Sequence, residues 1–353
     1  MNKKVATIQT VSSLLFIFLF PVLAFSQVPF YQGKTITVIS ASAAGGVGEL
    51  RERAVIRYLT KYIPGNPTII MEFMPGGGGR KAANYMFLKA RPDGLTIAGM
   101  SSAPVKNAVL KETGVEYEID KFLYLGAPNT EVHYVFSTRR EVGLNTLEKL
   151  RAKPGVRIGA QSVGHDIYVN GRLFAYLLDL KEPKFVTGYS GTELDLAVIR
   201  GEVDARTRIA DSLLRRSPEW VEKGLADFHS IIEVPKGKKH THPAFAQLPE
   251  VETFARTERE RKLVDMYRTF RLVGSPFILP PGTPRDRVEI LAEAMRRTFK
   301  DPGFFQDFKK LTGEDASPLM PEEQVKAIKE LPRDPDVIDL FKRLSGSDPM
   351  PQR

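Results

Sequence analysis

The sequence contains no cysteine and only one tryptophan. The absence of cysteine excludes a disulfide, a thiolate nucleophile, a thiolate metal site and a lipid-modified cysteine anchor. Beyond the N-terminus, no apolar run approaches the roughly 20 residues that a membrane-spanning helix needs. Stability must therefore come from packed cores, and a chain of 353 residues is long enough for two ordinary domains.

The N-terminus resembles a secretory signal. A pair of lysines precedes an apolar run from Val11 to Phe20, and the small residues Ala24 and Ser26 follow two positions apart. This order predicts a cleavable signal peptide over residues 1–26 and export to the periplasm; a retained N-terminal anchor is the alternative.

The formal net charge is +9, and removal of the two signal lysines lowers it to +7 (9 − 2). Such a charge suits an anionic partner without choosing its chemical class. The basic residues are scattered, and no aromatic residues interleave with them as base stacking requires. We therefore do not expect nucleic-acid binding.

Strand-like and helix-like segments alternate in two tandem units. This alternation predicts an α/β fold with helix-covered sheets. The expected strands are Thr35–Ser40, Thr68–Phe73, Thr96–Met100, Val156–Ala160 and Lys184–Thr187, and the expected helices are Glu49–Tyr62, Arg80–Ala90 and Asp166–Leu178.

The C-terminal third predicts a return to the first unit. An apolar strand is expected over Phe270–Phe277, and Thr283-Pro284 opens a helix that needs a sheet or helix to pack on. Extended segments near Val132–Ser137 and Phe270–Gly274 are the expected crossovers between two lobes. The tail from Asp334 to Arg353 is polar, and its order is left open.

Three turns of small residues join a strand to a helix, at Ala43–Gly48, Gln161–Gly164 and Gly188–Thr192. Unpaired amide groups and the helix dipole favour an anion at a helix start, and glycine permits close approach. Tight turns alone are the alternative for each segment. A nucleotide site is not expected, because the glycine patterns lack the last glycine of a dinucleotide fingerprint and the hydroxyl of a P-loop.

Several motifs resemble the receptor subunit of tripartite tricarboxylate transporters, the TctC or Bug family. The resemblance covers nearly the whole mature chain. Its motifs are YQGKTI from Tyr31, SAAGG from Ser42, YIPGNP from Tyr62, MPGGGG from Met74, AANY from Ala82, PDG from Pro92, TGYSGT from Thr187, RGEVD from Arg200 and LPPGTP from Leu279.

The resemblance implies a two-lobed, type II-like periplasmic binding protein, in which each lobe is a helix-covered mixed sheet and two crossover strands join the lobes. One lobe is expected to comprise residues 27–133 and 272–353, and the other residues 134–271. Similar proteins bind a small organic carboxylate and deliver it to TctA- and TctB-like permease subunits. We expect a monomer with no cofactor and no metal.

The family's ligand loops can be carried over by position. The expected ligand-binding residues are Ser42, Ala43, Ala44, Gly45, Gly46, Glu49, Ser101, Ser102, Ser162, Gly164, His165, Tyr189, Ser190, Gly191, Thr192 and Asp204. The family usually has Asp at the position of Glu49, Phe near Ser42 and a small residue at the position of His165, so the ligand's far end, charge or size can differ here. For Asp204, a turn or cap role is equally compatible with the sequence.

Enzymatic and metal sites are weaker interpretations. Ser162, His165 and Asp166 lie too close along one helix start to form a catalytic triad. His240 and His242 lack a third ligand in the sequence and are interpreted as part of a solvated loop. A carboxylate receptor is therefore predicted, with a ligand sensor that docks on a membrane kinase, or a secreted hydrolase, as alternatives.

Overall fold

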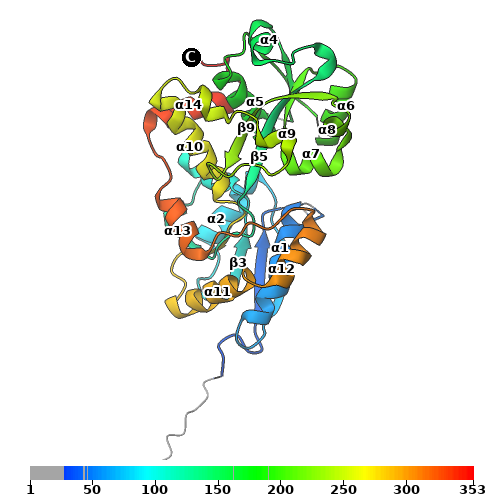
Figure 1. The fold of residues 1–353 in the computed structure, drawn as a ribbon. Coiled ribbons are helices and arrows are strands. Elements are labelled where there is room, and N and C mark those ends of the chain that lie inside the picture. Colours follow the sequence, from blue (N-terminus) through cyan, green and yellow to red (C-terminus); the bar gives the residue numbers. More distant parts are fainter. Residues whose placement is uncertain (1–27, 43, 46, 162, 190) are drawn as a thin grey trace, which may run out of the picture.

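The computed structural model describes residues 28–42, 44, 45, 47–161, 163–189 and 191–353. The predicted signal peptide and the predicted site residues Ala43, Gly46, Ser162 and Ser190 lie outside the described residues. The chain forms two lobes, each built on a five-stranded sheet with flanking helices (Figure 1). Within the described part of the chain, no helix has both the length and the apolar character needed to cross a membrane.

The first sheet has the strand order β2-β1-β3-β10-β4. Strands β1, β2 and β3 are parallel, whereas β10 is antiparallel to both β3 and β4. Its strands are β1 (Thr35–Ser40), β2 (Thr68–Phe73), β3 (Thr96–Gly99), β4 (Leu123–Tyr124) and β10 (Phe277–Leu279). The helical segments between them are α1 (Val47–Tyr62), η1 (Gly77–Gly79), α2 (Arg80–Leu88), α3 (Ala103–Val109) and η2 (Ile119–Lys121).

The second sheet has the order β7-β6-β8-β5-β9. Strand β6 is parallel to β7 and β8, and β5 is antiparallel to β8 and β9, so this sheet is also mixed. Its strands are β5 (Val132–Arg139), β6 (Arg157–Gly159), β7 (Lys184–Val186), β8 (Ala205–Ile209) and β9 (Ala226–Val234). The helical segments of this part are η3 (Arg140–Val142), α4 (Leu147–Ala152), α5 (Asp166–Leu177), α6 (Gly191–Ile199), α7 (Ala210–Arg216), α8 (Glu219–Glu222), α9 (Pro243–Ala246), η4 (Val251–Phe254) and α10 (Glu258–Leu272).

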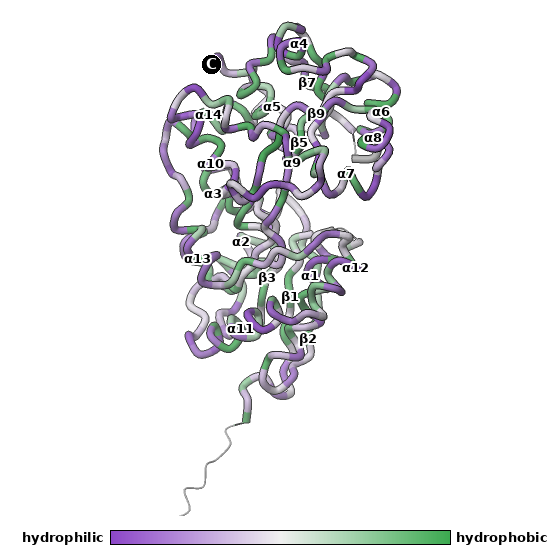
Figure 2. The backbone as a smooth tube through the Cα atoms, viewed as in Figure 1, coloured by the Kyte–Doolittle hydropathy of each residue, from purple (hydrophilic) through white to green (hydrophobic). Residues whose placement is uncertain are grey.

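After the second sheet, the chain returns to the first lobe as predicted. Helices α11 (Arg285–Thr298) and α12 (Pro302–Thr312) both pack against α1. The apolar face of α11 buries Leu291 and Met295, and α12 adds the fully buried Phe304 to the same core. In Figure 2 the strands β1 and β3 carry hydrophobic stretches, consistent with a sheet whose central strands are buried.

The chain crosses between the lobes at more than one point. The first crossing, from β4 into β5, is extended, as predicted. The prediction of an extended Phe270–Gly274 segment is wrong, because α10 continues to Leu272 and buries Phe270 on the same helical face as Leu263 and Tyr267. The three-to-four-residue spacing of these side chains is typical of a helix. Gly274 then turns with a φ of +68° into the segment before β10.

The C-terminal segment is ordered as two helices, α13 (Pro321–Lys329) and α14 (Pro335–Ser345). Helix α14 packs against α10 and α5 of the second lobe, so the chain crosses once more between α13 and α14 (Figure 1). Arg353 then bonds to Glu260 of α10 at 2.6 Å. The expected lobe boundaries at 133/134 and 271/272 stay predictions. Helix α14, which falls in the range expected for the first lobe, contacts the second lobe.

Candidate ligand-binding site

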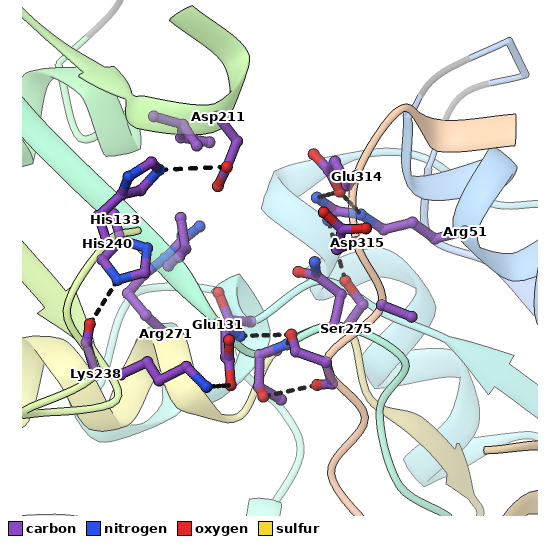
Figure 3. A pocket seen from close by; sticks show the side chains of 18 of the residues that line it. Arg51, Glu131, His133, Asp211, Lys238, His240, Arg271, Ser275, Glu314 and Asp315 are labelled. Carbon is purple, nitrogen blue, oxygen red and sulfur yellow. Dashed lines mark hydrogen bonds and ion pairs between the residues drawn. The ribbon is translucent and has the colours of Figure 1, made fainter. Parts of the chain in front are cut away.

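A polar cavity of about 330 Å³ lies between the two lobes (Figure 3). Both lobes contribute to its lining, because the segments after β3, around β5 and before β10 meet at the crossings. The lining residues are Arg51, Ser101, Ser102, Ala103, Asn129, Thr130, Glu131, Val132, His133, Asp166, Ile209, Asp211, Arg215, Lys238, Lys239, His240, Thr241, Arg271, Gly274, Ser275, Glu314, Asp315, Ala316 and Ser317.

The first-lobe wall combines hydroxyl groups with an ion pair. Ser101 and Ser102 follow β3, and the Oγ of Ser101 accepts a hydrogen bond from the Ala103 amide at 3.3 Å. Arg51 of α1 pairs with Glu314 at 2.6 Å and donates to the Ser275 hydroxyl at 3.3 Å. The guanidinium therefore links the loop after α12 to the segment before β10.

A second ion pair lies where α5 begins. Arg271, near the end of α10, contacts the carboxylate of Asp166 at 2.5 Å. Burial by itself would raise the pKa of Asp166, but the neighbouring Arg271 charge prevails and holds this pKa below its usual value. Both groups are therefore charged near neutral pH, and they tie α10 to the start of α5 beside the cavity.

The second-lobe wall contains two histidines and an aspartate. His133 and His240 are buried, and Asp211 is exposed. The Nε2 atom of His240 lies 3.4 Å from Oδ1 of Asp211, and that of His133 lies 2.6 Å from the Lys238 carbonyl oxygen. Contact with His240 holds the pKa of Asp211 below its usual value, although burial opposes this. The solvated-loop interpretation is therefore wrong for His240.

The cavity is not lined by positive charges alone. Its lining carries five lysine or arginine side chains and five aspartate or glutamate side chains. Three of the cations are paired within the lining, namely Arg51 with Glu314, Arg271 with Asp166, and Lys238 with Glu131 at 3.4 Å. Beside hydroxyl and amide donors, an anionic guest can therefore use the two other cations of the lining, Arg215 and Lys239, or displace one of these carboxylates.

Among the predicted site residues, Ser101 and Ser102 line the cavity. The described part of the first loop does not, and neighbouring side chains occupy two of its amide groups. The Ser42 amide donates to the Ser40 hydroxyl at 3.2 Å, and the Gly45 amide donates to the Glu49 carboxylate. This amide, with help from Arg53, lowers the pKa of Glu49. Exposed Ala44 lies in the same turn.

The loop before α5 faces the first lobe at another point. The Gly164 carbonyl accepts a hydrogen bond from Lys106 of α3 at 3.4 Å, so the lobes touch there. The Nδ1 atom of His165 accepts the Ile167 amide at 3.2 Å and caps α5. Burial lowers the pKa of His165, so the ring is neutral at pH 7. A neutral cap of this kind adds no positive charge for a ligand.

The other described residues predicted in the second lobe are not part of the cavity lining. Tyr189 donates its hydroxyl hydrogen to Glu202 at 3.1 Å, and Gly191 and Thr192 begin α6. Asp204 accepts from the Arg157 backbone amide at 3.0 Å and pairs with its guanidinium at 2.5 Å. This contact links the start of β6 to the residue before β8, and the expected ligand role of Asp204 stays a prediction.

Sequence reasoning did not identify most of the cavity wall. Arg51, His133, Asp211 and Arg271 carry no local motif, because four separate segments contribute them. His240, a further polar residue of the second-lobe wall, did have a signal in the sequence, namely its proximity to His242.

The fold matches solved structures over most of the chain. The chain is similar to a TctC solute-binding protein from Polaromonas, with 15% identity over 89% of this chain and 98% of that one and a TM-score of 0.64. MatC from Rhodopseudomonas palustris with bound malate has 20% identity over 89% and 99% of the two chains and a TM-score of 0.57. Another R. palustris protein, with adipate, has 13% identity over 88% and 96% and a TM-score of 0.56. No protein-family model and no curated protein sequence matches.

These comparisons, together with the two mixed sheets, define the architectural class. The chain has the two-lobed, type II periplasmic binding protein fold, as the sequence predicted. At these identities the likeness establishes the fold, and ligand and partners have to be argued from the site.

Proposed function

We propose that this chain is an exported solute-binding receptor of the TctC type, which captures a small organic carboxylate between its lobes and has no catalytic activity. The observation that carries the proposal is the polar cavity enclosed by both lobes of this fold. The motifs that resemble the family support it, as do the malate and adipate bound in two structures of the same fold.

The lining also supports a carboxylate ligand. Ser275 lies across the cavity from His133 and His240 (Figure 3), and the hydroxyl-bearing residues Ser101 and Ser102 of the first lobe also line it. Hydrogen bonds to a charged group contribute about 1.5–3 kcal/mol each, so a few such contacts correspond to micromolar affinity. Because the guest touches both lobes, its binding favours the closed arrangement.

The cellular setting is part of the same proposal. The lysine pair, apolar run and small residues of the N-terminus support export to the periplasm. We infer that the loaded receptor, a monomer, delivers its ligand to TctA- and TctB-like permease subunits. A sensor that docks on a membrane kinase would use the same cavity, and permease genes next to this gene would favour the transporter.

Isothermal titration calorimetry against mono-, di- and tricarboxylates tests the proposal. We expect micromolar or tighter binding of at least one carboxylate, and no turnover of ester or amide substrates. Binding of a sugar or an uncharged amide in place of any carboxylate would refute the ligand class, and substrate turnover would refute the receptor function.

A further inference from the structure

We propose that His133, Asp211 and His240 form a binding site for a divalent transition-metal ion on the second-lobe wall of the cavity. Two imidazoles and one carboxylate are a donor set suited to Zn²⁺, Co²⁺ or Ni²⁺. One potential ligand atom from each residue lies within 4.8 Å of the other two. Figure 3 shows the three side chains grouped on the wall opposite Arg51 and Glu314.

The sheet topology brings these residues together. Tyr134 of β5 pairs with Ile209 of β8, so His133 lies beside the start of α7, where Asp211 is the second residue. On the other side of β5, Val132 pairs with Val234, the last residue of β9. The loop that leaves β9 therefore passes the start of β5 and places His240 there, with the two imidazole centroids 5.1 Å apart.

One distance between ligand atoms already matches that of a metal site. With metal–ligand bonds of about 2.0–2.1 Å, neighbouring ligand atoms of a tetrahedral ion lie about 3.3 Å apart. The distance between Nε2 of His240 and Oδ1 of Asp211 is 3.4 Å. A small inward movement of His133 would complete three corners, because its atom lies within 4.8 Å of the other two.

The hydrogen bond of His133 favours ligation. Its Nε2 lies 2.6 Å from the Lys238 carbonyl oxygen, which can only accept, so this nitrogen carries the proton. The Nδ1 atom then has a free lone pair. A backbone carbonyl that orients a histidine in this way is the usual support of a metal-binding imidazole.

His240 must exchange one hydrogen bond to bind the metal. Its Nδ1 accepts the His242 amide at 3.0 Å, so the neutral ring carries its proton on Nε2, toward Asp211. For Nε2 to coordinate, the proton has to move to Nδ1 and the His242 amide has to find another acceptor.

The cavity side of the ion stays open. Three protein ligands leave a fourth position, which is the arrangement of metal sites that bind an exogenous molecule. Arg215 and Lys239 line the same cavity, so a metal that carries a carboxylate with it suits the local charge better than a bare cation. The inference that the metal carries a carboxylate rests on the proposed function, whereas metal binding by the three residues does not.

Calorimetry with Zn²⁺ or Co²⁺ alone, on protein first treated with EDTA and then dialysed, tests the site. We expect one ion per chain with a micromolar or lower Kd, and at least tenfold weaker binding in His133→Gln, His240→Gln and Asp211→Asn. The matched control Asp339→Asn, on the exposed face of α14, should bind as the unaltered chain does.

The cobalt complex provides a second readout, because coordination by nitrogen and oxygen ligands shifts its visible absorption. No binding by the unaltered protein, or equal binding by all four variants, would overturn the site. Metal binding without any carboxylate binding would refute the proposed function and support the metal site. Carboxylate binding without any metal binding would refute the metal site and support the proposed function.

Discussion

Glu52 of α1 provides a pH-dependent test of how the first lobe is packed. Its side chain is buried, with 3% exposure, and its Oε2 atom finds no hydrogen-bond partner among the described residues. Burial raises the pKa of Glu52 to about 7, and the nearby Glu49 adds to the shift, while a hydrogen bond with Ser40 opposes it.

The size of the effect follows from linkage. The shift from 4.5 to about 7 is 2.5 pH units, which corresponds to about 3 kcal/mol at 1.36 kcal/mol per unit. Since the folded pKa lies above the unfolded one, the unfolded state loses its proton first as the pH rises. The contribution of Glu52 to stability is therefore most favourable below pH 4.5 and becomes less favourable up to about pH 7.

Glu52→Gln keeps the shape of the side chain and removes the ionisation. We expect the variant to be more stable than the unaltered chain by about 3 kcal/mol at pH 8 and by about 1 kcal/mol or less at pH 5. Urea unfolding at both pH values measures the difference. Glu148→Gln, at an exposed position of α4, is the matched control and should show no such pH-dependent gain. An equal gain from Glu52→Gln at both pH values would show that packing, and not ionisation, sets its effect.

Three further substitutions test other parts of the fold by denaturant unfolding. Arg268 contacts Glu250 and Glu252 at 2.6 and 2.5 Å. Arg268→Met should destabilise the protein by about 3–5 kcal/mol, because both carboxylates lose this buried partner. A loss of stability under about 1 kcal/mol would contradict this. Phe304→Ala should cost about 3–5 kcal/mol through the cavity it opens in the first-lobe core, and a near-neutral effect would mean that the core does not pack as described. Gly274→Ala should cost at least about 1–3 kcal/mol, since its Cβ would lie 2.3 Å from the Asn129 carbonyl oxygen at a φ of +68°; an unchanged midpoint would exclude that close approach.

Local patterns predicted the first lobe well. The β-branched run Thr35–Ser40 and the amphipathic segment after it form β1 and α1. Both could be predicted because a helix that buries one face against a sheet has apolar residues at helical spacing. The same reasoning failed at Phe270. A short apolar run fits a strand and a buried helix end equally well, and only packing against α14, where Phe270 contacts Phe341, decides between them.

The candidate site was harder to predict for a different reason. Ser101 and Ser102 could be placed because they follow a predicted strand and the family resemblance carries its ligand loops over by position. The amide of Gly45 looked free in the sequence, yet the Glu49 carboxylate four residues later accepts its hydrogen bond. His133, Asp211 and His240 are brought together by strand register across the second sheet, and no single segment carries a sign of it.

The central claim is that a carboxylate binds in the cavity between the lobes. Calorimetric titration of malate or adipate into Ser102→Phe and Ser102→Ala tests it most directly, because Ser102 lines that cavity and its side chain accepts no capping hydrogen bond from α3. The account predicts that the bulky phenylalanine abolishes the binding seen in the unaltered chain, while alanine weakens it by about 10- to 150-fold, as the loss of one hydrogen bond to a charged group implies. A folded Ser102→Phe protein that binds the carboxylate with unchanged affinity would contradict it.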